Sequence, residues 1–256
     1  MLEQRLKTIQ EHLFARGVSS IEALVEVTRS SPATVRRDLS KLEQDGVIQR
    51  THGGARLAES SSLELAFGVR ERENIEVKRA IGRAAHALLK PGSTVLMDAG
   101  TTVLQLAKAV RLEPIPLTVI TNGLALAQEL VNLPEVSVIL LGGSLRSDNL
   151  SSVGPYTEKL LSEFWCDQLF LGATAIDQSE HLATLDANEA SLNRKMLERA
   201  KQRILLLDSS KFGHSAPYRV TSLQGITQII TDSRLAAAWS KRLNHLGIGI
   251  QLVSST

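Results

Sequence analysis

The stretch SSPATVRRDLSKLEQDGVIQRTHGGARL, residues 30–57, decides how the N-terminal part of the chain folds. Ser31 is a favourable N-cap, and Pro32 occupies the first helical position, where its missing N–H costs nothing. Apolar residues then recur at helical spacing and give the helix one apolar face; they are Val35, Leu39 and Leu42. The pattern predicts a helix over residues 32–45 that ends at Gly46.

A shorter helix is predicted just before this one. Ser19 and Glu22 have the spacing of a capping box, and the helix that they open breaks at residues 29–30. Two helices joined by so tight a turn predict a helix-turn-helix. An amphipathic segment further upstream would pack across both and complete a three-helix core. Its apolar face consists of Leu2, Leu6, Ile9 and Leu13.

The residues after the second helix predict a β-hairpin. Residues 47–57 alternate toward a Gly53–Gly54 turn that has basic residues on both sides. We therefore predict a winged helix-turn-helix over residues 1–57, in which the second helix meets base edges and the wing lies on the phosphate backbone. The candidate DNA-binding residues are Ser31, Thr34, Arg36, Arg37, Lys41, Arg50, His52 and Arg56. We also expect Asp38 to orient an arginine.

The competing interpretation is that Arg36, Arg37 and Lys41 form a solvated helix face, which is the usual role of clustered charges. That interpretation does not account for the capped helix start, the two-helix spacing and the basic turn together, so we favour DNA binding. For His52 we expect a contact with phosphate or with the turn rather than with a metal. No second His or Cys lies near it at the spacing of metal ligands.

The charge balance indicates a focused contact with DNA. The net charge is only +2, and nine Lys or Arg stand against seven Asp or Glu in residues 1–56, whereas the remainder is balanced. So small a surplus predicts that affinity comes from one basic patch and from two heads acting together. We therefore expect a homo-oligomer, either a dimer or a tetramer.

The remaining residues are numerous enough for a second domain. Residues 58–75 are serine-rich and then charged, which predicts a linker able to carry a short helix, followed by a domain over residues 76–256. The chain is 43% hydrophobic with few aromatic residues, as expected for an aliphatic α/β core. We find no long apolar run and no signal peptide, and so expect a cytoplasmic protein without membrane contact. The single cysteine, Cys166, excludes an intrachain disulfide, and we expect it to be buried rather than nucleophilic.

Short apolar runs alternate with helical patterns after residue 76, which is typical of βα units and a mainly parallel sheet. Helical patterns begin at residue 76 and recur at residues 102–110 and 124–131. The predicted strands are residues 93–97, 117–121, 136–141, 168–172, 204–207, 226–231 and 248–253. The predicted fold class is therefore α/β, with a winged helix-turn-helix domain before a larger α/β domain.

Polar residues and glycines follow several of these strands, and ligands of open α/β sheets bind at the carboxyl ends of strands. The turn DAGTT, residues 98–102, opens a helix, so its N–H groups and threonine hydroxyls could hold a phosphate. Lys211 could neutralise the phosphate charge. Taken alone, such a turn is more often a plain helix cap and such a lysine is more often solvated. Several similar turns at equivalent strand ends favour a polyhydroxylated, anionic ligand.

The motifs TVRRDL, LEQDG and RTHGGA closely resemble the N-terminal signature of the DeoR family of bacterial transcriptional regulators. Further along, DAGTT, TNG, LLGG, DQLFLGATAID and DSSKFG resemble the sugar-phosphate-sensing domain of that family. The resemblance implies a sensor domain similar to ribose-5-phosphate isomerase and a repressor of a sugar-catabolic operon. It implies double-stranded operator DNA and a phosphorylated sugar effector as partners, with no cofactor and no metal. FLGATAID followed by EASLNRKM looks most like regulators of amino-sugar and galactitol or tagatose use.

The resemblance also implies which residues bind the effector. Matching the motifs residue by residue gives Asp98, Gly100, Thr101, Thr102, Thr121, Asn122, Gly142, Gly143 and Lys211. Glu189 and Lys195 are further candidates, although a solvent-facing helix explains their charges equally well. Ser152 and Gly154 could close the pocket, and a plain surface loop is an equally good interpretation of them.

Two other functions stay open at this point. The same fold could isomerise a sugar phosphate with a carboxylate base and a lysine. The carboxylates and Lys211 are residues of the types that this catalysis needs. A DNA-binding head argues against turnover, because a sensor needs an intact ligand that binds two states differently. Alternatively, the α/β domain only holds copies of the chain together.

Overall fold

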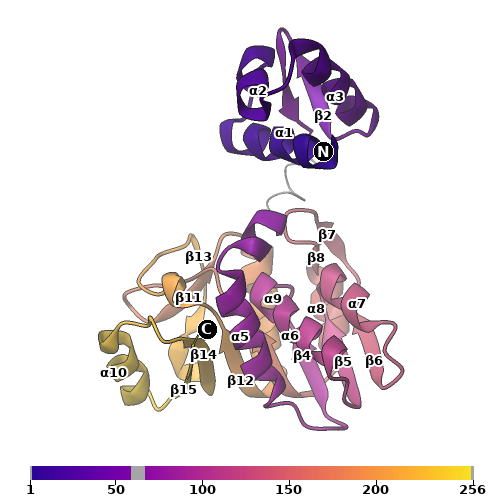
Figure 1. Cartoon of the computed structure of the whole chain (residues 1–256). Coiled ribbons are helices and arrows are strands. Elements are labelled where there is room, and N and C mark those ends of the chain that lie inside the picture. Colours follow the sequence, from indigo (N-terminus) through magenta and orange to yellow (C-terminus); the bar gives the residue numbers. More distant parts are fainter. Residues whose placement is uncertain (1, 59–66, 255–256) are drawn as a thin grey trace. The chain divides into compact units, whose positions relative to one another are not determined.

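The structure is a computed structural model that describes residues 2–58 and 67–254 (Figure 1). It divides into two compact units, Met1–Arg70 and Glu71–Thr256. Residues 59–66 of the predicted linker lie outside the described residues, and residues 67–72 are helical. No helix among the described residues is both long enough and apolar enough to cross a membrane.

The N-terminal unit is a three-helix bundle with a wing, as predicted. Its helices are α1 (Leu2–Arg16), α2 (Ile21–Thr28) and α3 (Pro32–Gln44). The Ser31 hydroxyl accepts the N–H of Thr34 at 3.2 Å and caps α3, and Gly46 follows the helix with a φ of +70°. Buried residues from all three helices and the wing form one cluster; they include Ile9, Leu13, Leu24, Val35, Leu39, Leu42 and Ile48. Leu2, expected in the apolar face, is 42% exposed and stays outside it.

Two local predictions in this unit are off by one residue. The cap of α2 is Ser20, whose hydroxyl accepts the N–H of Ala23, and not Ser19. Both serines form a short strand, β1 (Ser19–Ser20), and α2 begins directly after it at Ile21. The wing consists of β2 (Ile48–Thr51) and β3 (Gly54–Leu57), so the turn is formed by residues 52–53 and not by Gly53–Gly54. β1 pairs with the outer side of β3.

Gly54 explains why the wing can carry this third strand. A Cβ atom at Gly54 would lie 2.1 Å from the backbone oxygen of Ser19. Only glycine lets the two backbones approach so closely, since any side chain would push the strands apart. The second glycine of the wing is thus required by β-pairing, and the first, Gly53, supplies the positive φ of +83° in the turn.

The C-terminal unit contains a seven-stranded sheet in the order β15-β14-β12-β9-β4-β5-β6, with every neighbouring pair parallel. All seven predicted strands belong to it, and the parallel arrangement is confirmed. The strands are β4 (Thr94–Met97), β5 (Leu117–Thr121), β6 (Val136–Leu140), β9 (Cys166–Leu171), β12 (Ala200–Leu206), β14 (Gln228–Asp232) and β15 (Gly249–Val253).

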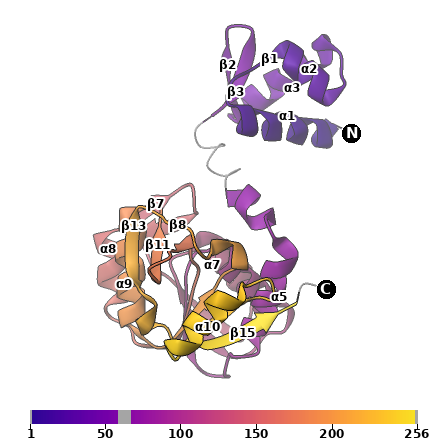
Figure 2. The same cartoon turned by 90° about the vertical axis from the view of Figure 1, so that its left-hand side faces the viewer.

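Helices cover both faces of this sheet. They are α5 (Ile75–His86), α6 (Thr101–Leu112), α7 (Leu124–Leu130), α8 (Pro155–Leu161), α9 (Ala187–Glu198) and α10 (Ala237–His245). From β4, the sheet continues through β5 to β6 on one side. On the other side it continues through β9, β12 and β14 to β15. Because βαβ crossovers are right-handed, α6 and α7 lie on one face and α9 on the other. Figure 2 shows α8 and α9 on the left of this unit and α5 on the right.

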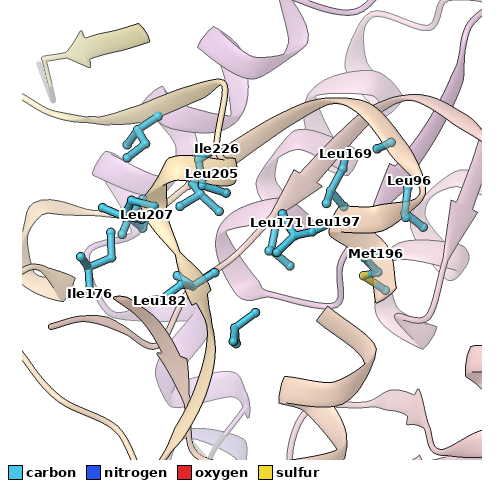
Figure 3. Packing of buried hydrophobic residues seen from close by; sticks show 14 of the residues in the cluster. Leu96, Leu169, Leu171, Ile176, Leu182, Met196, Leu197, Leu205, Leu207 and Ile226 are labelled. Atoms are coloured by element: carbon cyan, nitrogen blue, oxygen red, sulfur yellow. The ribbon is translucent and has the colours of Figure 1, made fainter. Parts of the chain in front are cut away.

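The main core lies between the central strands and α9 (Figure 3). Strand residues such as Leu96, Leu169 and Leu205 pack with Met196 and Leu197 of α9, and all of them are buried. Cys166 is buried as expected, and burial raises the pKa of its thiol to about 11, so it stays protonated. This core fixes the positions at which β4, β9 and β12 end.

Several short strands were not predicted. β7 (Ser144–Arg146) and β8 (Ser151–Val153) form a hairpin, and β10 (Ala175–Ile176), β11 (His181–Thr184) and β13 (Tyr218–Ser222) form a small antiparallel sheet. Most have only two to four residues, too few for an alternating pattern to be recognised. Both additions lie next to the strand ends that were predicted to bind a ligand.

Candidate functional site

Helix α3 presents polar groups at its start and exposed basic groups further along. The hydroxyls of Ser31 and Thr34 lie 2.9 Å apart, and the side chains of Arg36, Arg37 and Lys41 are exposed. Within the described residues, these three cations form no side-chain hydrogen bond or ion pair. They are therefore available to a ligand that lies against α3.

Arg50 and Arg56 in the wing have structural partners as well as exposure to solvent. Arg50 donates to the backbone oxygen of Arg36 at 3.0 Å and to the hydroxyl of Ser40 at 3.1 Å, which ties the wing to α3. Arg56 donates twice to Gln49 on the neighbouring strand. His52 is exposed in the turn itself.

Asp38 does orient an arginine, but that arginine comes from α1. The buried carboxylate of Asp38 accepts from Nε of Arg5 and, at 3.1 Å, from its Nη2, and this hydrogen bonding raises the pKa of Arg5. A buried acid facing a neighbouring helix locks the orientation of α3 on α1. Arg36 and Arg37 are thus left without this carboxylate, which favours their use against an anion.

The candidate effector site lies where the strand order reverses. β4 is flanked by β5 and β9, and the chain leaves β4 toward β5 but later returns on its other side as β9. Ligands of open α/β sheets bind at this switch point, outside the carboxyl ends of the strands. Asp98 directly follows β4, and its Oδ2 accepts the N–H groups of Gly100 at 3.1 Å and of Gly172, after β9, at 3.2 Å. Asp98 thus bridges the two strand ends.

The carboxyl group of Asp98 has an unusual proton affinity. It is only 4% exposed, and burial followed by the nearby charge of Glu189 raises its pKa to about 7. Backbone N–H groups act in the opposite direction but do not cancel these effects. At neutral pH this group can therefore donate or accept a hydrogen bond to a hydroxyl.

The turn DAGTT opens α6 as predicted. Gly100 is its N-cap and offers no side-chain acceptor, so the first N–H groups of α6 are not capped by that residue. Lys78 of α5, only 3% exposed, donates from Nζ to the Thr101 hydroxyl at 3.2 Å. Sequence reasoning missed Lys78; the signal that could have found it was a lysine between Val77 and Ile81 in an apolar helical pattern.

The ends of β5 and β6 form a second part of the site, and they are held to the β7–β8 hairpin. Asn122 donates from Nδ2 to the backbone oxygen of Ser152 at 3.1 Å, and Ser152 returns its N–H to the oxygen of Asn122 at 2.8 Å. The Thr121 hydroxyl accepts the N–H of Gly123 at 3.0 Å. Oδ1 of Asn122 is buried and has no partner among the described residues, so it can accept a hydrogen bond from a ligand.

Gly143 allows the chain to pass closely over α8, whereas a Cβ at Gly142 would meet nothing within 4 Å. Gly143 has a φ of +150°, and a Cβ there would lie 1.9 Å from the Thr157 hydroxyl. That hydroxyl donates to the oxygen of Gly142 at 2.8 Å. Gly154, with a φ of +96°, turns the chain from β8 into α8. These predicted residues therefore shape the backbone beside the site.

The end of β12 carries the motif DSSKFG. Asp208 is buried, and its Oδ1 accepts the N–H of Ser210 at 3.0 Å and Nδ2 of Asn74 at 3.4 Å. Oδ2 of Asp208 is buried without a hydrogen-bond partner in the described part of the chain. Lys211 is the last residue of a 3₁₀ turn (Ser209–Lys211) that follows Asp208, and its side chain is half-buried.

Glu189 belongs to a charged cluster whose centre, Arg146, was not predicted. Arg146 of β7 lies 2.6 Å from Glu189 and 2.6 Å from Asp148, and 3.4 Å from Asp186. This cluster joins the hairpin to the start of α9, and the charge of Glu189 reaches Asp98. Lys195 is exposed six residues further along α9, about 9 Å from Glu189 along the helix axis. The structure brings Glu189 to Asp98, but not Lys195.

Both units match known protein domains. Residues 5–61 match the DeoR-like helix-turn-helix domain, and residues 73–233 match the DeoR C-terminal sensor domain. The chain belongs to the DeoR family. The family resemblance predicted from the motifs is therefore confirmed, as is the division into a helix-turn-helix domain and a larger α/β domain.

Named relatives of this DeoR-family chain cover nearly its whole length. It is 32% identical over 252 residues to a putative aga operon transcriptional repressor of Escherichia coli. The matched residues are 98% of this chain and 93% of the relative. It is 35% identical over 230 residues to the glycerol-3-phosphate regulon repressor of Escherichia coli, with 90% of each chain covered. Ribose 5-phosphate isomerase A from Methanocaldococcus jannaschii is similar with a TM-score of 0.40 and 17% identity, over 54% of this chain and 55% of that one.

Proposed function

We propose that this protein is a transcriptional repressor of a sugar-catabolic operon that a phosphorylated sugar releases from its operator. The observation that carries the proposal is the pairing of two features in one chain. One is a helix-turn-helix whose cations are exposed and, within the described residues, form no ion pairs. The other is a buried carboxyl group at the switch point of a parallel sheet. The names of the relatives support repression.

The head would bind operator DNA through α3 and the wing. Arg36 and Arg37 would contact bases or phosphates, while Lys41, His52 and Arg56 would contact phosphates. The first unit has only a small positive surplus, so one head would bind weakly. Two or more copies of the chain that present paired heads would raise affinity without any new contact. We therefore propose that the protein acts as a homo-oligomer.

The effector would lie across the ends of β4, β5 and β9. Its phosphate would bind the first N–H groups of α6, where the helix dipole favours an anion, with Lys211 supplying positive charge. Its hydroxyls would bind Asp98 and Oδ1 of Asn122, which has no partner among the described residues. Ser152 and Gly154 would close the site on the side of the hairpin. Glu189 would lie at the edge of the site, held there by its ion pair with Arg146.

Release of DNA requires that the effector prefer one arrangement of the oligomer over another. A ligand shifts such an equilibrium only by its differential affinity for the two states. The β7–β8 hairpin would respond to the ligand, because it contacts the strand ends through Asn122 and reaches α9 through Arg146. Ligand-dependent movement of this hairpin would change the distance or freedom of the paired heads.

One observation favours a second candidate, an isomerase-like enzyme. A carboxyl group whose pKa is about 7 is suited to general acid–base catalysis at neutral pH, and Asp98 is such a group. Incubating the protein with pentose and hexose phosphates in deuterated water tests this, since an enediol mechanism exchanges a carbon-bound proton for deuterium. Robust exchange that the Asp98→Asn substitution removes would replace the regulator-only proposal.

The main test is fluorescence anisotropy on labelled DNA from upstream of this gene and its neighbours. The panel would contain amino-sugar and hexitol phosphates because of the motif resemblance, and glycerol 3-phosphate because of the named relative. Salt-sensitive binding that one phosphorylated compound relieves would support the proposal and identify the effector. Tight binding that no compound changes, together with an unchanged melting temperature, would favour a domain that only joins copies of the chain.

A further inference from the structure

Exposed apolar side chains occur on α8 and on the two segments that precede it. Tyr156 and Leu160 lie one turn apart on α8, and both are exposed. Leu140 ends β6, the last strand of the sheet, and Leu145 belongs to β7; both are exposed as well. Single exposed apolar residues are common, so the meaning of these four depends on whether they are neighbours. We call the four residues the α8 surface.

Backbone contacts bring the segments of the α8 surface together. A Cβ at Gly143 would lie 1.9 Å from the Thr157 hydroxyl, and that hydroxyl donates to the oxygen of Gly142 at 2.8 Å. The chain that leaves β6 therefore packs directly on the start of α8. Leu140 lies two residues before this contact and Leu145 two residues after it. Figures 1 and 2 both show the β7–β8 hairpin next to α8.

The apolar stripe of α8 borders this contact. With 3.6 residues per turn, Leu160 falls between Tyr156 and Thr157 when α8 is viewed along its axis. Thr157 faces the connection from β6 to β7, and Leu161, beyond Thr157, is fully buried. Tyr156 and Leu160 therefore adjoin the connection that carries Leu140 and Leu145.

The α8 surface is large enough to be the centre of an interface. Tyr156 is 81% exposed, and with the three leucines it leaves on the order of 400 Å² of mainly apolar side chain in contact with water. Exposed patches of this size on soluble proteins mark interaction sites. A specific interface buries about 800 Å² on each partner, so polar neighbours would supply the rim.

The charges beside the stripe indicate which partner fits. Lys159 and Glu163 are exposed and lie four residues apart, on either side of Leu160 in the sequence. This spacing would allow an ion pair within the chain, yet neither side chain has an ion pair or a hydrogen bond among the described residues. A second copy of α8, antiparallel about a two-fold axis, would set Lys159 opposite Glu163 twice, because a two-fold interface repeats each contact. The surface is thus complementary to its own copy.

We propose that two copies of this chain associate through the α8 surface about a two-fold axis, with Tyr156 and Leu160 at the centre and the Lys159–Glu163 pairs at the rim. Tyrosine is among the residues that most often dominate the affinity of an interface, so Tyr156 is the main contributor. The association needs no ligand. It would supply the paired heads on which tight operator binding depends.

The same location connects the interface to the effector site. Gly154 turns the chain from β8 into α8, and Ser152 of β8 exchanges hydrogen bonds with Asn122 at the end of β5. A ligand that shifts the hairpin would therefore shift the start of α8 and the copy that lies against it. This consequence rests on the proposed function, whereas the association itself does not.

The test is sedimentation velocity of the full-length protein. The double variant Tyr156→Arg, Leu160→Arg should have half the mass of the wild type, whether the wild type is a dimer or a tetramer. Tyr156→Ser, a milder change, should raise the dissociation constant at least tenfold. Leu112→Arg is the matched control, because Leu112 is also 81% exposed but ends α6, and it should keep the wild-type mass. Circular dichroism checks that each variant is folded.

Charge reversal tests whether the partner is a second copy. Lys159→Glu and Glu163→Lys should each raise the dissociation constant about fivefold, since like charges then face each other, and the two changes together should restore it. Lack of restoration would overturn the two-fold arrangement.

The outcomes separate this proposal from the proposed function. An oligomeric wild type whose mass the double arginine variant leaves unchanged would overturn the interface alone. A monomeric wild type would overturn the homo-oligomer together with the interface. Operator binding and its release by sugar phosphates are read separately by anisotropy, so a failure of the repressor proposal would leave the measured mass of the oligomer and its dependence on Tyr156 intact.

Discussion

The two units of this chain place their charged residues in opposite ways. In the helix-turn-helix unit, Arg36, Arg37 and Lys41 are exposed and form no ion pairs among the described residues, while the buried acid Asp38 is matched by Arg5. In the sensor unit, Asp98, Asp208 and Lys78 are buried near strand ends. Exposed charges give long-range, salt-dependent attraction, whereas buried polar groups discriminate between ligands because a mismatch leaves them unpaired. The difference indicates that one unit binds a polyanion by charge and the other recognises a small ligand by geometry.

The largest expected effect is on DNA binding. Replacing Arg36 and Arg37 together with alanine should weaken operator binding by about 1–3 kcal/mol for each base that the protein no longer reads, and should reduce its dependence on salt. Both side chains are exposed, so the melting temperature and effector binding should not change. Anisotropy at several salt concentrations measures the first effect, and calorimetry the second. Simultaneous failure of DNA and effector binding would indicate misfolding and remove the contrast between the units.

The converse substitutions lie in the sensor unit. Asp98→Asn and Lys211→Ala should leave operator binding intact but weaken the effector by about 1.5–3 kcal/mol, the usual value of a hydrogen bond to a charged group. The measurement is the effector concentration that releases half of the labelled DNA. Lys195→Ala is the matched control, because this exposed lysine lies away from Asp98. A wild-type response in both Asp98 and Lys211 variants would remove the proposed pocket.

The buried acid also predicts a pH dependence of stability. The pKa of Asp98 is raised from 3.8 in the unfolded chain to about 7, so folding takes up a proton between these values. This carboxyl therefore lowers the stability of the folded state as the pH rises from 3.8 to about 7, by up to about 1.4 kcal/mol per pH unit, and its cost is constant above. Urea unfolding of the wild type and Asp98→Asn across this window measures the difference. Parallel curves for the two proteins would contradict the raised pKa.

The smallest effect concerns the neighbour of this acid. Glu189→Gln removes the charge that helps to raise the pKa of Asp98, so that pKa should fall by less than about one unit at the effective dielectric of a protein interior. Burial, the larger cause, remains, so the value should stay above that of an ordinary aspartate. Carbon-detected NMR titration of the Asp98 carboxyl reports it directly. An unchanged pKa would mean that Glu189 and Asp98 are not coupled.

The sequence predicted what regular spacing encodes. Helices α1 to α3 and the seven parallel strands have enough residues for periodicity to be read, and caps such as Ser31 mark where helices begin. The order of the strands was not predicted, because parallel pairing is set by crossovers and packing rather than by local pattern. β1 was missed for a related reason: two serines have no strand pattern, and their pairing depends on the missing side chain of Gly54.

The candidate site was predicted only where its residues follow strands. Asp98, Thr121 and Asn122 come directly at strand ends, so their neighbourhood follows from the parallel sheet. Lys78 and Arg146 were missed because they reach the site from a preceding helix and from an unpredicted hairpin. Their roles depend on contacts between residues far apart in the sequence, which no local pattern contains.

The measurement that tests the central claim most directly is release of operator DNA by a sugar phosphate, compared between the wild type and Asp98→Asn in the same anisotropy titration. We expect both proteins to bind the DNA equally and only the wild type to be released at low effector concentration. Equal release of both would place the effector elsewhere on the chain. No release of the wild type by any phosphorylated sugar would contradict the proposed coupling between the two units.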